Sequence, residues 1–183
     1  MNSLEDREAL ELLDFWLGQG MARWFGKSDE FDAECQAHVA LWERARDGAC
    51  DHWAATAAGA LALVILLDQI PRNAFRGQAA QFSTDGKALQ VAKAAIAAGF
   101  DRSQPMPSRM FFYMPFEHSE DLAVQERSLD LMRPLGDQDT YYWALVHYDA
   151  IRRFGRFPHR NAVLGRETTA AEQAYLDTGG FGH

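Results

Sequence analysis

Apolar residues recur along almost the whole chain at the three- and four-residue spacing of an α-helix. No stretch alternates regularly between apolar and polar residues, so strands are not expected. Residues 53–69 are apolar on nearly every side, which predicts a central buried helix that Pro71 ends. The spacing predicts further helices over residues 3–17, 28–47, 84–98, 107–114, 119–133, 138–154 and 169–178. We therefore expect one all-α domain over residues 1–183, with about seven or eight helices packed as antiparallel pairs.

Several polar residues are typical of helix starts. Ser3 with Asp6, Ser28, and Ser119 are placed to cap three of the predicted helices. Thr169 followed by Glu172 predicts a capping box for the last one. The loop of about a dozen residues before it is long for a compact domain, which suggests a role of its own.

The net charge of −8 argues against a protein that coats nucleic acid, because phosphate neutralisation needs a basic surface. The sequence shows no signal peptide, and no apolar run reaches the roughly 20 residues of a membrane span. Cys35 and Cys50 are too few for a disulfide framework. We expect a cytoplasmic protein with no membrane or nucleic-acid partner. The oligomeric state stays open, with the glycine-flanked Trp24-Phe25 pair as a candidate homodimer face.

The first polar motif follows the central helix. Asp68 continues the apolar stripe of that helix, and a buried carboxylate needs a partner, for which Arg72 is the nearest candidate. The other polar residues of the motif are Gln69, Asn73 and Arg76. These residues suit either a structural ion-pair network or a ligand site.

A second motif lies at a proline break, where Glu117, His118 and Glu120 precede a predicted helix. Glu117 and His118 are candidates for general base and acid. Together with His147 and His159 they are also metal ligands by type. Because nothing in their spacing selects a metal, we predict neither a metal nor a cofactor.

The third motif spans residues 147–161. His147 lies on an apolar helix face and is expected to point inward. Beyond it the polar residues are dense: Arg152, Arg153, Arg156, His159, Arg160 and Asn161. Arginines this close repel one another unless negative charge lies between them. That charge could come from Asp68, Glu117 and Glu120, or from a bound anion.

Several common chemistries have no sequence signature in this chain. It contains no glycine-rich phosphate loop, no dinucleotide-binding fingerprint and no nucleophile elbow. The Glu-x-x-His pattern of di-iron helical bundles is also missing.

The three motifs resemble a known family. The segments LLDQIPRNAFRG, YMPFEHSE with the later QERS, and HYDAIRRFGRFPHRNAVLGR are similar to the bacterial family called domain of unknown function 924. The similarity runs from the DFW at Asp14–Trp16 to the Gly-Gly-Phe near the end of the chain. It implies a tetratricopeptide-like α-α superhelix and brings no established activity with it. The polar residues of the three motifs match family positions.

Three hypotheses follow. The first is a helical binding module in which the motifs converge on one concave groove for an anionic small molecule or an acidic peptide. Its candidate ligand-binding residues are Asp68, Gln69, Arg72, Asn73, Arg76, Arg153, Arg156, His159, Arg160 and Asn161.

The second hypothesis is a small-molecule hydrolase, lyase or transferase. Glu117 and His118 would be its acid–base pair, and His147 or His159 a second proton carrier. The third is a structural network, in which Asp68 pairs with Arg72, and Glu117 or Glu120 pairs with the loop arginines.

Overall fold

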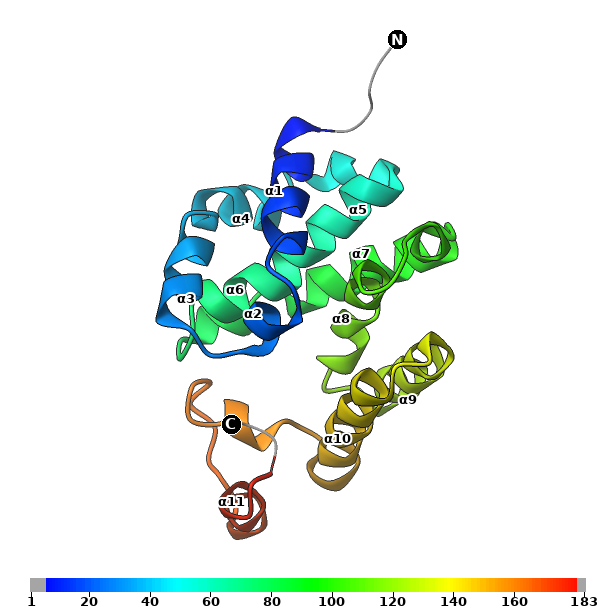
Figure 1. The fold of residues 1–183 in the computed structure, drawn as a ribbon. Coiled ribbons are helices and arrows are strands. Elements are labelled where there is room, and N and C mark those ends of the chain that lie inside the picture. The colour runs from blue at the N-terminus through cyan, green and yellow to red at the C-terminus, as the bar shows by residue number, and fades with distance from the viewer. Residues whose placement is uncertain (1–5, 181–183) are drawn as a thin grey trace. The chain divides into compact units, whose positions relative to one another are not determined.

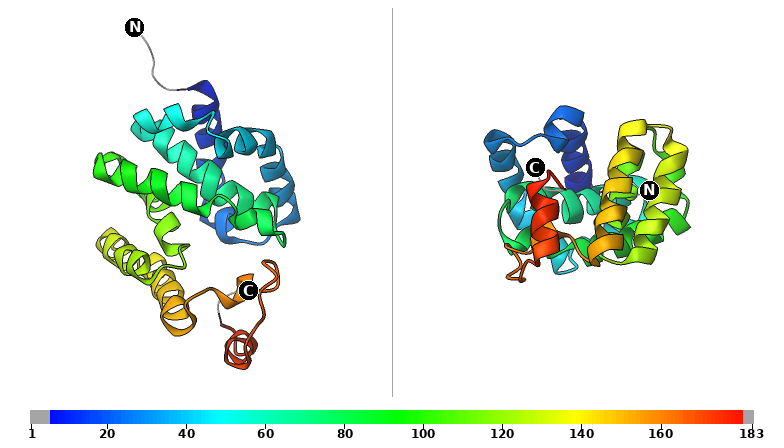
Figure 2. Two further views of the ribbon diagram at one scale, coloured as in Figure 1. Left: turned by 180° about the vertical axis from the view of Figure 1, so that it is seen from behind. Right: turned by 90° about the horizontal axis from the view of Figure 1, so that it is seen from below.

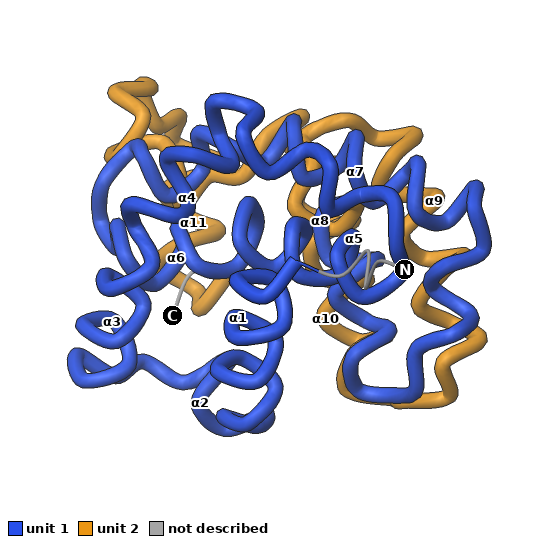
Figure 3. The backbone as a smooth tube through the Cα atoms, turned by 90° about the horizontal axis from the view of Figure 1, so that it is seen from above, with its two compact units in different colours: residues 1–115 blue, residues 116–183 orange. Residues whose placement is uncertain are grey.

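The computed structural model of the chain describes residues 6–180, and every regular element within that range is helical (Figure 1). The all-α prediction is therefore confirmed, although the structure divides the predicted helices more finely. The chain separates into two compact units, residues 1–115 and 116–183, which Figure 3 shows in different colours. The single domain over 1–183 and the superhelical arrangement stay predictions.

The first unit contains most of the α-helices. They are α1 (Arg7–Leu17), α2 (Met21–Phe25), α3 (Asp29–Gln36), α4 (Val39–Arg46), α5 (Ala57–Val64), α6 (Ile70–Ala74) and α7 (Asp85–Ala97). Short 3-10 turns connect them at Asp51–Ala55, Ala79–Phe82, Phe100–Ser103 and Ser108–Phe112. α5 packs against α1 and α7, and α6 packs against α3 and α4.

The apolar central helix is the buried axis of this unit, as its composition predicts. Every residue from Gly59 to Pro71 is buried. Its ending was predicted wrongly, because Pro71 does not stop it. A π-helical turn over Ile65–Gln69 leads directly into α6, and Pro71 occupies the first turn of α6. The first N–H groups of a helix have no partner within it, so proline costs little at that place.

Helix starts agree with the sequence in part. Asp6 caps α1, whereas Ser3 lies outside the described residues. Ser28 caps α3, but the helix predicted over 28–47 breaks after Gln36, and α4 begins at Val39. The Trp24-Phe25 pair lies in α2, where Trp24 is buried against Trp16 and Phe25 is exposed.

The second unit begins within α8 (Met114–Glu117) and contains α9 (Leu122–Met132), α10 (Gln138–Phe154) and α11 (Ala170–Asp177). α9 and α10 form an antiparallel pair, which both panels of Figure 2 show. Ser119 does not cap α9. Asp121 does, because its carboxylate accepts hydrogen bonds from the N–H groups of Ala123 and Val124.

The last part of this unit follows the prediction closely. α10 has the predicted bounds and ends at Gly155, whose φ of 68° is a left-handed conformation that glycine adopts without strain. The loop that follows contains a 3-10 turn over Pro158–Arg160, and α11 packs against that turn. Thr169 and Glu172 form the predicted capping box at the start of α11.

Candidate functional site

The polar motif of the first unit lies on the π-helical turn and α6. Asp68 is fully buried, and its Oδ2 accepts a hydrogen bond of 2.6 Å from Gln69 Nε2. A guanidinium nitrogen of Arg72 lies 3.4 Å from Asp68 Oδ1 and also donates to the Asp68 main-chain oxygen. The predicted contact between Asp68 and Arg72 therefore exists. π-Helical turns often occur at functional sites, and here the turn directs a carboxylate inward.

The arginines of this motif bind carboxylates from other helices of the same unit. Arg72 donates two hydrogen bonds, of 2.9 and 3.0 Å, to Asp85 at the start of α7. Arg76 donates two, of 2.6 and 2.8 Å, to Asp32 of α3. It also donates to Asn73 Oδ1 at 2.8 Å. These pairs join α6 to α7, and the turn after α6 to α3, which is the arrangement that a structural network requires.

In the second unit the structure brings together Glu117 and His147, two of the residues proposed for acid–base chemistry. His147 Nδ1 lies 2.8 Å from Glu117 Oε1 and 2.8 Å from the Trp143 main-chain oxygen. A main-chain oxygen can only accept a hydrogen bond, so Nδ1 carries the proton. In the neutral form of the ring, Nε2 is then the nitrogen without a proton. His147 is 6% exposed, so the prediction that it points inward is confirmed.

His118 and Gln125 lie beside this pair. The His118 and His147 ring centroids are 5.8 Å apart. Gln125 Nε2 donates to the main-chain oxygens of Glu117 and Ser119, at 2.5 and 2.7 Å, and so fixes the turn that carries Glu117 and His118. Gln125 is part of the QERS segment, but its place in the sequence alone indicates no role for it.

Glu120 holds the arginine-rich loop against this turn. Its carboxylate accepts hydrogen bonds from the Phe157 N–H at 2.8 Å and from two nitrogens of Arg166 at 2.8 and 3.0 Å. Burial alone would raise the pKa of the Glu120 carboxyl, but these hydrogen bonds outweigh burial and lower the pKa below its ordinary value. The Arg160 guanidinium donates to the His118 main-chain oxygen at 3.0 Å and lies over the Phe157 ring.

Arg156 is bound by the capping box of α11. It donates hydrogen bonds of 2.6 and 2.9 Å to the two carboxylate oxygens of Glu172, which is 2% exposed. These bonds lower the pKa of Glu172 to about 2. In the same loop Asn161 Nδ2 lies 3.4 Å from Thr168 Oγ1, and the His159 ring lies 5.5 Å from that of Phe157.

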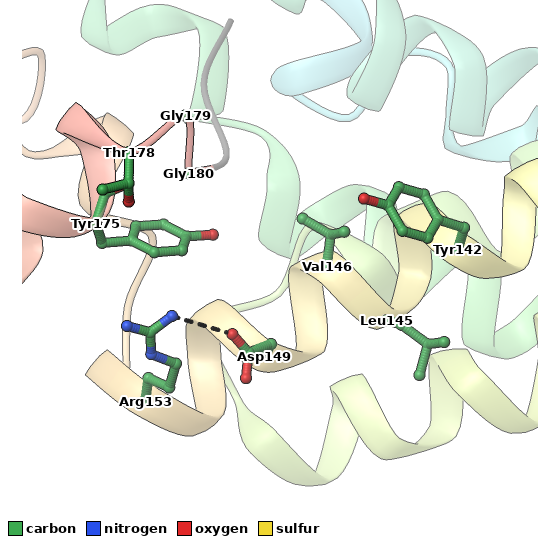
Figure 4. Close-up of a pocket in the computed structure, with 9 residues that line it drawn as sticks. All are labelled: Tyr142, Leu145, Val146, Asp149, Arg153, Tyr175, Thr178, Gly179 and Gly180. Atoms are coloured by element: carbon green, nitrogen blue, oxygen red, sulfur yellow. Dashed lines mark hydrogen bonds and ion pairs between the residues drawn. The ribbon is translucent and has the colours of Figure 1, made fainter.

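A pocket of about 420 Å³ opens between α10 and α11 of the second unit (Figure 4). It is lined by Tyr142, Leu145, Val146, Asp149 and Arg153 of α10, by Tyr175 of α11, and by the turn at residues 178–180. The α10 residues recur at helical spacing, so they form one stripe. At 100° per residue His147 lies on a different face of α10.

Arg153 is the proposed ligand-binding residue that lines this pocket. Its guanidinium stacks over the rings of Phe154 and Tyr175, with distances of 4.8 and 4.9 Å to the ring centroids. It donates a long hydrogen bond of 3.3 Å to Asp149, one helical turn away. Both side chains of this ion pair are about half exposed, at 48% for Arg153 and 51% for Asp149.

Tyr142, Asp149, Arg166 and Tyr175 were not predicted as site residues, and Glu172 was predicted only as part of the capping box. The stripe of Tyr142, Leu145, Val146, Asp149 and Arg153 is a signal that could have revealed the α10 wall, because its spacing is visible in the sequence. Tyr175 is contributed by another helix and has no comparable signal.

Over residues 6–180, no group of three or more histidine, cysteine, aspartate or glutamate side chains is arranged to hold a metal ion. Nor does that part of the chain contain a helix with the length and apolar character needed to cross a membrane.

Comparisons with other proteins point to one family. A solved structure of a protein of unknown function from Agrobacterium tumefaciens is 42% identical in sequence, with a TM-score of 0.90. The match covers 93% of this chain and 97% of that one. A comparison with curated proteins found no match. The model of the family described as "Bacterial protein of unknown function (DUF924)" matches residues 12–180. Because that match spans nearly the whole chain, the chain belongs to this bacterial family.

Proposed function

We propose that the chain is a small-molecule binding module, and that the pocket between α10 and α11 takes the anionic group of its ligand. The observation that carries this proposal is the guanidinium of Arg153 on the wall of the pocket. The planar fork of an arginine matches a carboxylate or a phosphate. The volume of about 420 Å³ lies within the roughly 300–1,000 Å³ typical of small-molecule sites.

Arg153 suits this role better than Arg156, because their carboxylate partners differ in burial. Glu172 is buried, so an anion that displaced it from Arg156 would leave a buried carboxylate unpaired. Asp149 is half exposed, and an exposed ion pair contributes only about 0–1 kcal/mol. A ligand can therefore replace Asp149 on Arg153 at small cost in free energy.

Native mass spectrometry of freshly purified protein tests the proposal. We expect the wild-type chain to retain an adduct of small-molecule mass and Arg153→Gln to lose it. Arg152→Gln is the matched control, since Arg152 is the exposed neighbour on the same helix and its replacement removes the same charge. An adduct that survives in Arg153→Gln, or a wild-type chain that stays bare after incubation with a small-molecule extract, would contradict the proposal.

A second candidate function is acid–base catalysis, and the 2.8 Å contact between Glu117 and His147 favours it. The geometry changes the roles first proposed. Glu117 orients the imidazole, His147 Nε2 accepts the proton, and His118 is the second proton carrier. A carboxylate that holds Nδ1–H of a histidine is a frequent arrangement in enzymes that transfer protons.

The ¹⁵N chemical shifts of the imidazole nitrogens test this second candidate without a known substrate. We expect neutral His147 to carry its proton on Nδ1, and Glu117→Gln to raise the fraction with the proton on Nε2. A wild-type His147 protonated on Nε2 alone would exclude these roles. In a substrate screen, His147→Gln should abolish any activity found, and an activity that persists would exclude His147 as its catalytic base.

A further inference from the structure

We infer that the ligand of the α10–α11 pocket is a zwitterion, namely a free α-amino acid with an apolar side chain. The inference rests on the proposed binding function of this pocket and names the class of ligand. It draws on the charges that line the pocket, on the apolar surface around them, and on the way the two are arranged (Figure 4).

Among the described residues that line the pocket, one is a cation and one is an anion. Arg153 and Asp149 lie one helical turn apart, with 3.3 Å between a guanidinium nitrogen and Asp149 Oδ2. A ligand with negative charge alone would approach Arg153 but would also lie close to the Asp149 carboxylate, which repels it. A ligand that carries an ammonium group beside its carboxylate satisfies both side chains.

An α-amino acid places those two groups on a single carbon atom. Its carboxylate can accept hydrogen bonds from the guanidinium fork of Arg153, while its ammonium donates to Asp149. The direct contact between Arg153 and Asp149 is long and half exposed, so opening it exchanges a weak pair for two charge-assisted ones. A phosphate ester carries up to two negative charges and no cation. It would therefore place negative charge beside the Asp149 carboxylate with no positive group to compensate it.

The remainder of the pocket wall is mostly apolar. Leu145 and Val146 contribute aliphatic surface, and Tyr142 and Tyr175 contribute rings. In the view of Figure 4, Val146 and Asp149 lie between the two tyrosines. This surface suits an apolar side chain, and burying it removes water from both partners.

The Tyr175 ring is held from two sides, so this part of the wall is formed before ligand binds. The Arg153 guanidinium lies 4.9 Å from its centroid. At Gly180, a Cβ atom would approach ring carbons to 2.7 Å, so glycine allows close contact there. The N–H of Gly180 donates to the Tyr175 main-chain oxygen, so it is already hydrogen-bonded within the turn.

Isothermal titration calorimetry of the full-length chain with three related molecules tests the inference. L-phenylalanine carries both charges, 3-phenylpropionate lacks the ammonium, and 2-phenylethylamine lacks the carboxylate. We expect L-phenylalanine to bind at least about tenfold more tightly than either of the other two. Glycine, which has both charges but no apolar side chain, should also bind at least about tenfold more weakly.

Two variants assign the charges. Asp149→Asn should weaken the binding of L-phenylalanine and leave the binding of 3-phenylpropionate unchanged or tighter. The reason is that this change removes the acceptor for the ammonium group and, with it, the negative charge that repels the carboxylate. Arg153→Gln should weaken the binding of both molecules. Arg152→Gln, at an exposed position on the same helix outside the pocket, should change neither. Melting temperatures of the three variants close to that of the wild type establish that they are folded.

The outcomes separate this inference from the function on which it rests. If 3-phenylpropionate binds as tightly as L-phenylalanine, and Asp149→Asn strengthens both, the ligand is a simple anion and only the zwitterion inference is overturned. If none of the molecules binds more tightly than about 10 mM, the inference is overturned, while an adduct lost on Arg153→Gln would still support the binding function. If no such adduct exists either, both fail.

Discussion

Replacing Glu120 with alanine should lower the free energy of unfolding by about 2–4 kcal/mol. The Glu120 carboxylate is the acceptor for the Phe157 N–H and the partner of the Arg166 guanidinium. Its removal leaves a donor in the arginine-rich loop without that acceptor, and a half-buried cation without its carboxylate. Urea denaturation followed by circular dichroism measures the loss, and hydrogen exchange at the Phe157 amide locates it.

Glu120→Gln is the matched control. Its side-chain oxygen can still accept from the Phe157 N–H and from one Arg166 nitrogen, so it should lose less stability than alanine. The loss that remains in glutamine reports the negative charge and the second hydrogen bond to Arg166. A loss below about 0.5 kcal/mol for Glu120→Ala would show that this carboxylate does not hold the loop.

The second large effect is expected at the capping box of α11. The pKa of Glu172 in the folded chain is lowered to about 2. A carboxyl whose pKa is lowered by folding stabilises the folded state above its unfolded pKa, which is about 4.3 for glutamate. That stabilisation is lost progressively as the pH falls through the range from about 4.3 to about 2. The melting temperature of the wild-type chain should therefore fall as the pH is lowered through this range.

Glu172→Gln should already lack this stabilisation at neutral pH, with a melting temperature lower by on the order of 5 °C. Its melting temperature should also fall less between pH 5 and pH 2, because the titrating group is gone. Glu167→Gln removes the same charge from an exposed side chain of the same loop and should keep the wild-type pH profile. Equal pH profiles for wild type and Glu172→Gln would contradict this account.

Local sequence patterns predicted the elements whose determinants lie close together in the chain. The capping box at Thr169 and the bounds of α10 are of this kind. So is the contact between Asp68 and Arg72, which are four residues apart. The prediction for the end of the central helix is wrong because proline can mark the start of a helix as well as its end. The π-helical turn leads directly into α6, and the proline lies in the first turn of α6, where its missing N–H costs little.

Contacts between distant residues left no such pattern. Arg76 binds Asp32, 44 residues away, and Arg166 binds Glu120, 46 residues away. An isolated arginine indicates the chemistry of its partner but not its position in the chain. The sequence therefore leaves open whether Asp68, Glu117 and Glu120 or a bound anion neutralise the arginines of the third motif. In the structure the carboxylate that binds Arg156 is that of Glu172, which was not among these candidates.

Of the residues that line the candidate pocket, the sequence predicted only Arg153 as a ligand-binding residue. The sequence places Asp149 and Arg153 four residues apart on a helix, which is enough to predict an exposed ion pair. It gives no sign that Tyr175 of α11 lies against that guanidinium. A pocket formed by two helices depends on their packing, and the spacing within one helix does not report it.

The central claim is that Arg153 binds the anionic group of a ligand, and the ¹⁵N-edited NMR signal of its Nε–H group tests it most directly. Arg153→Gln assigns this signal by its disappearance. On titration with L-phenylalanine or 3-phenylpropionate, the account predicts a saturable shift of the Arg153 signal and none for Arg152. A saturable shift confined to other arginine signals would contradict it, as would binding of either molecule by calorimetry that leaves the Arg153 signal unchanged.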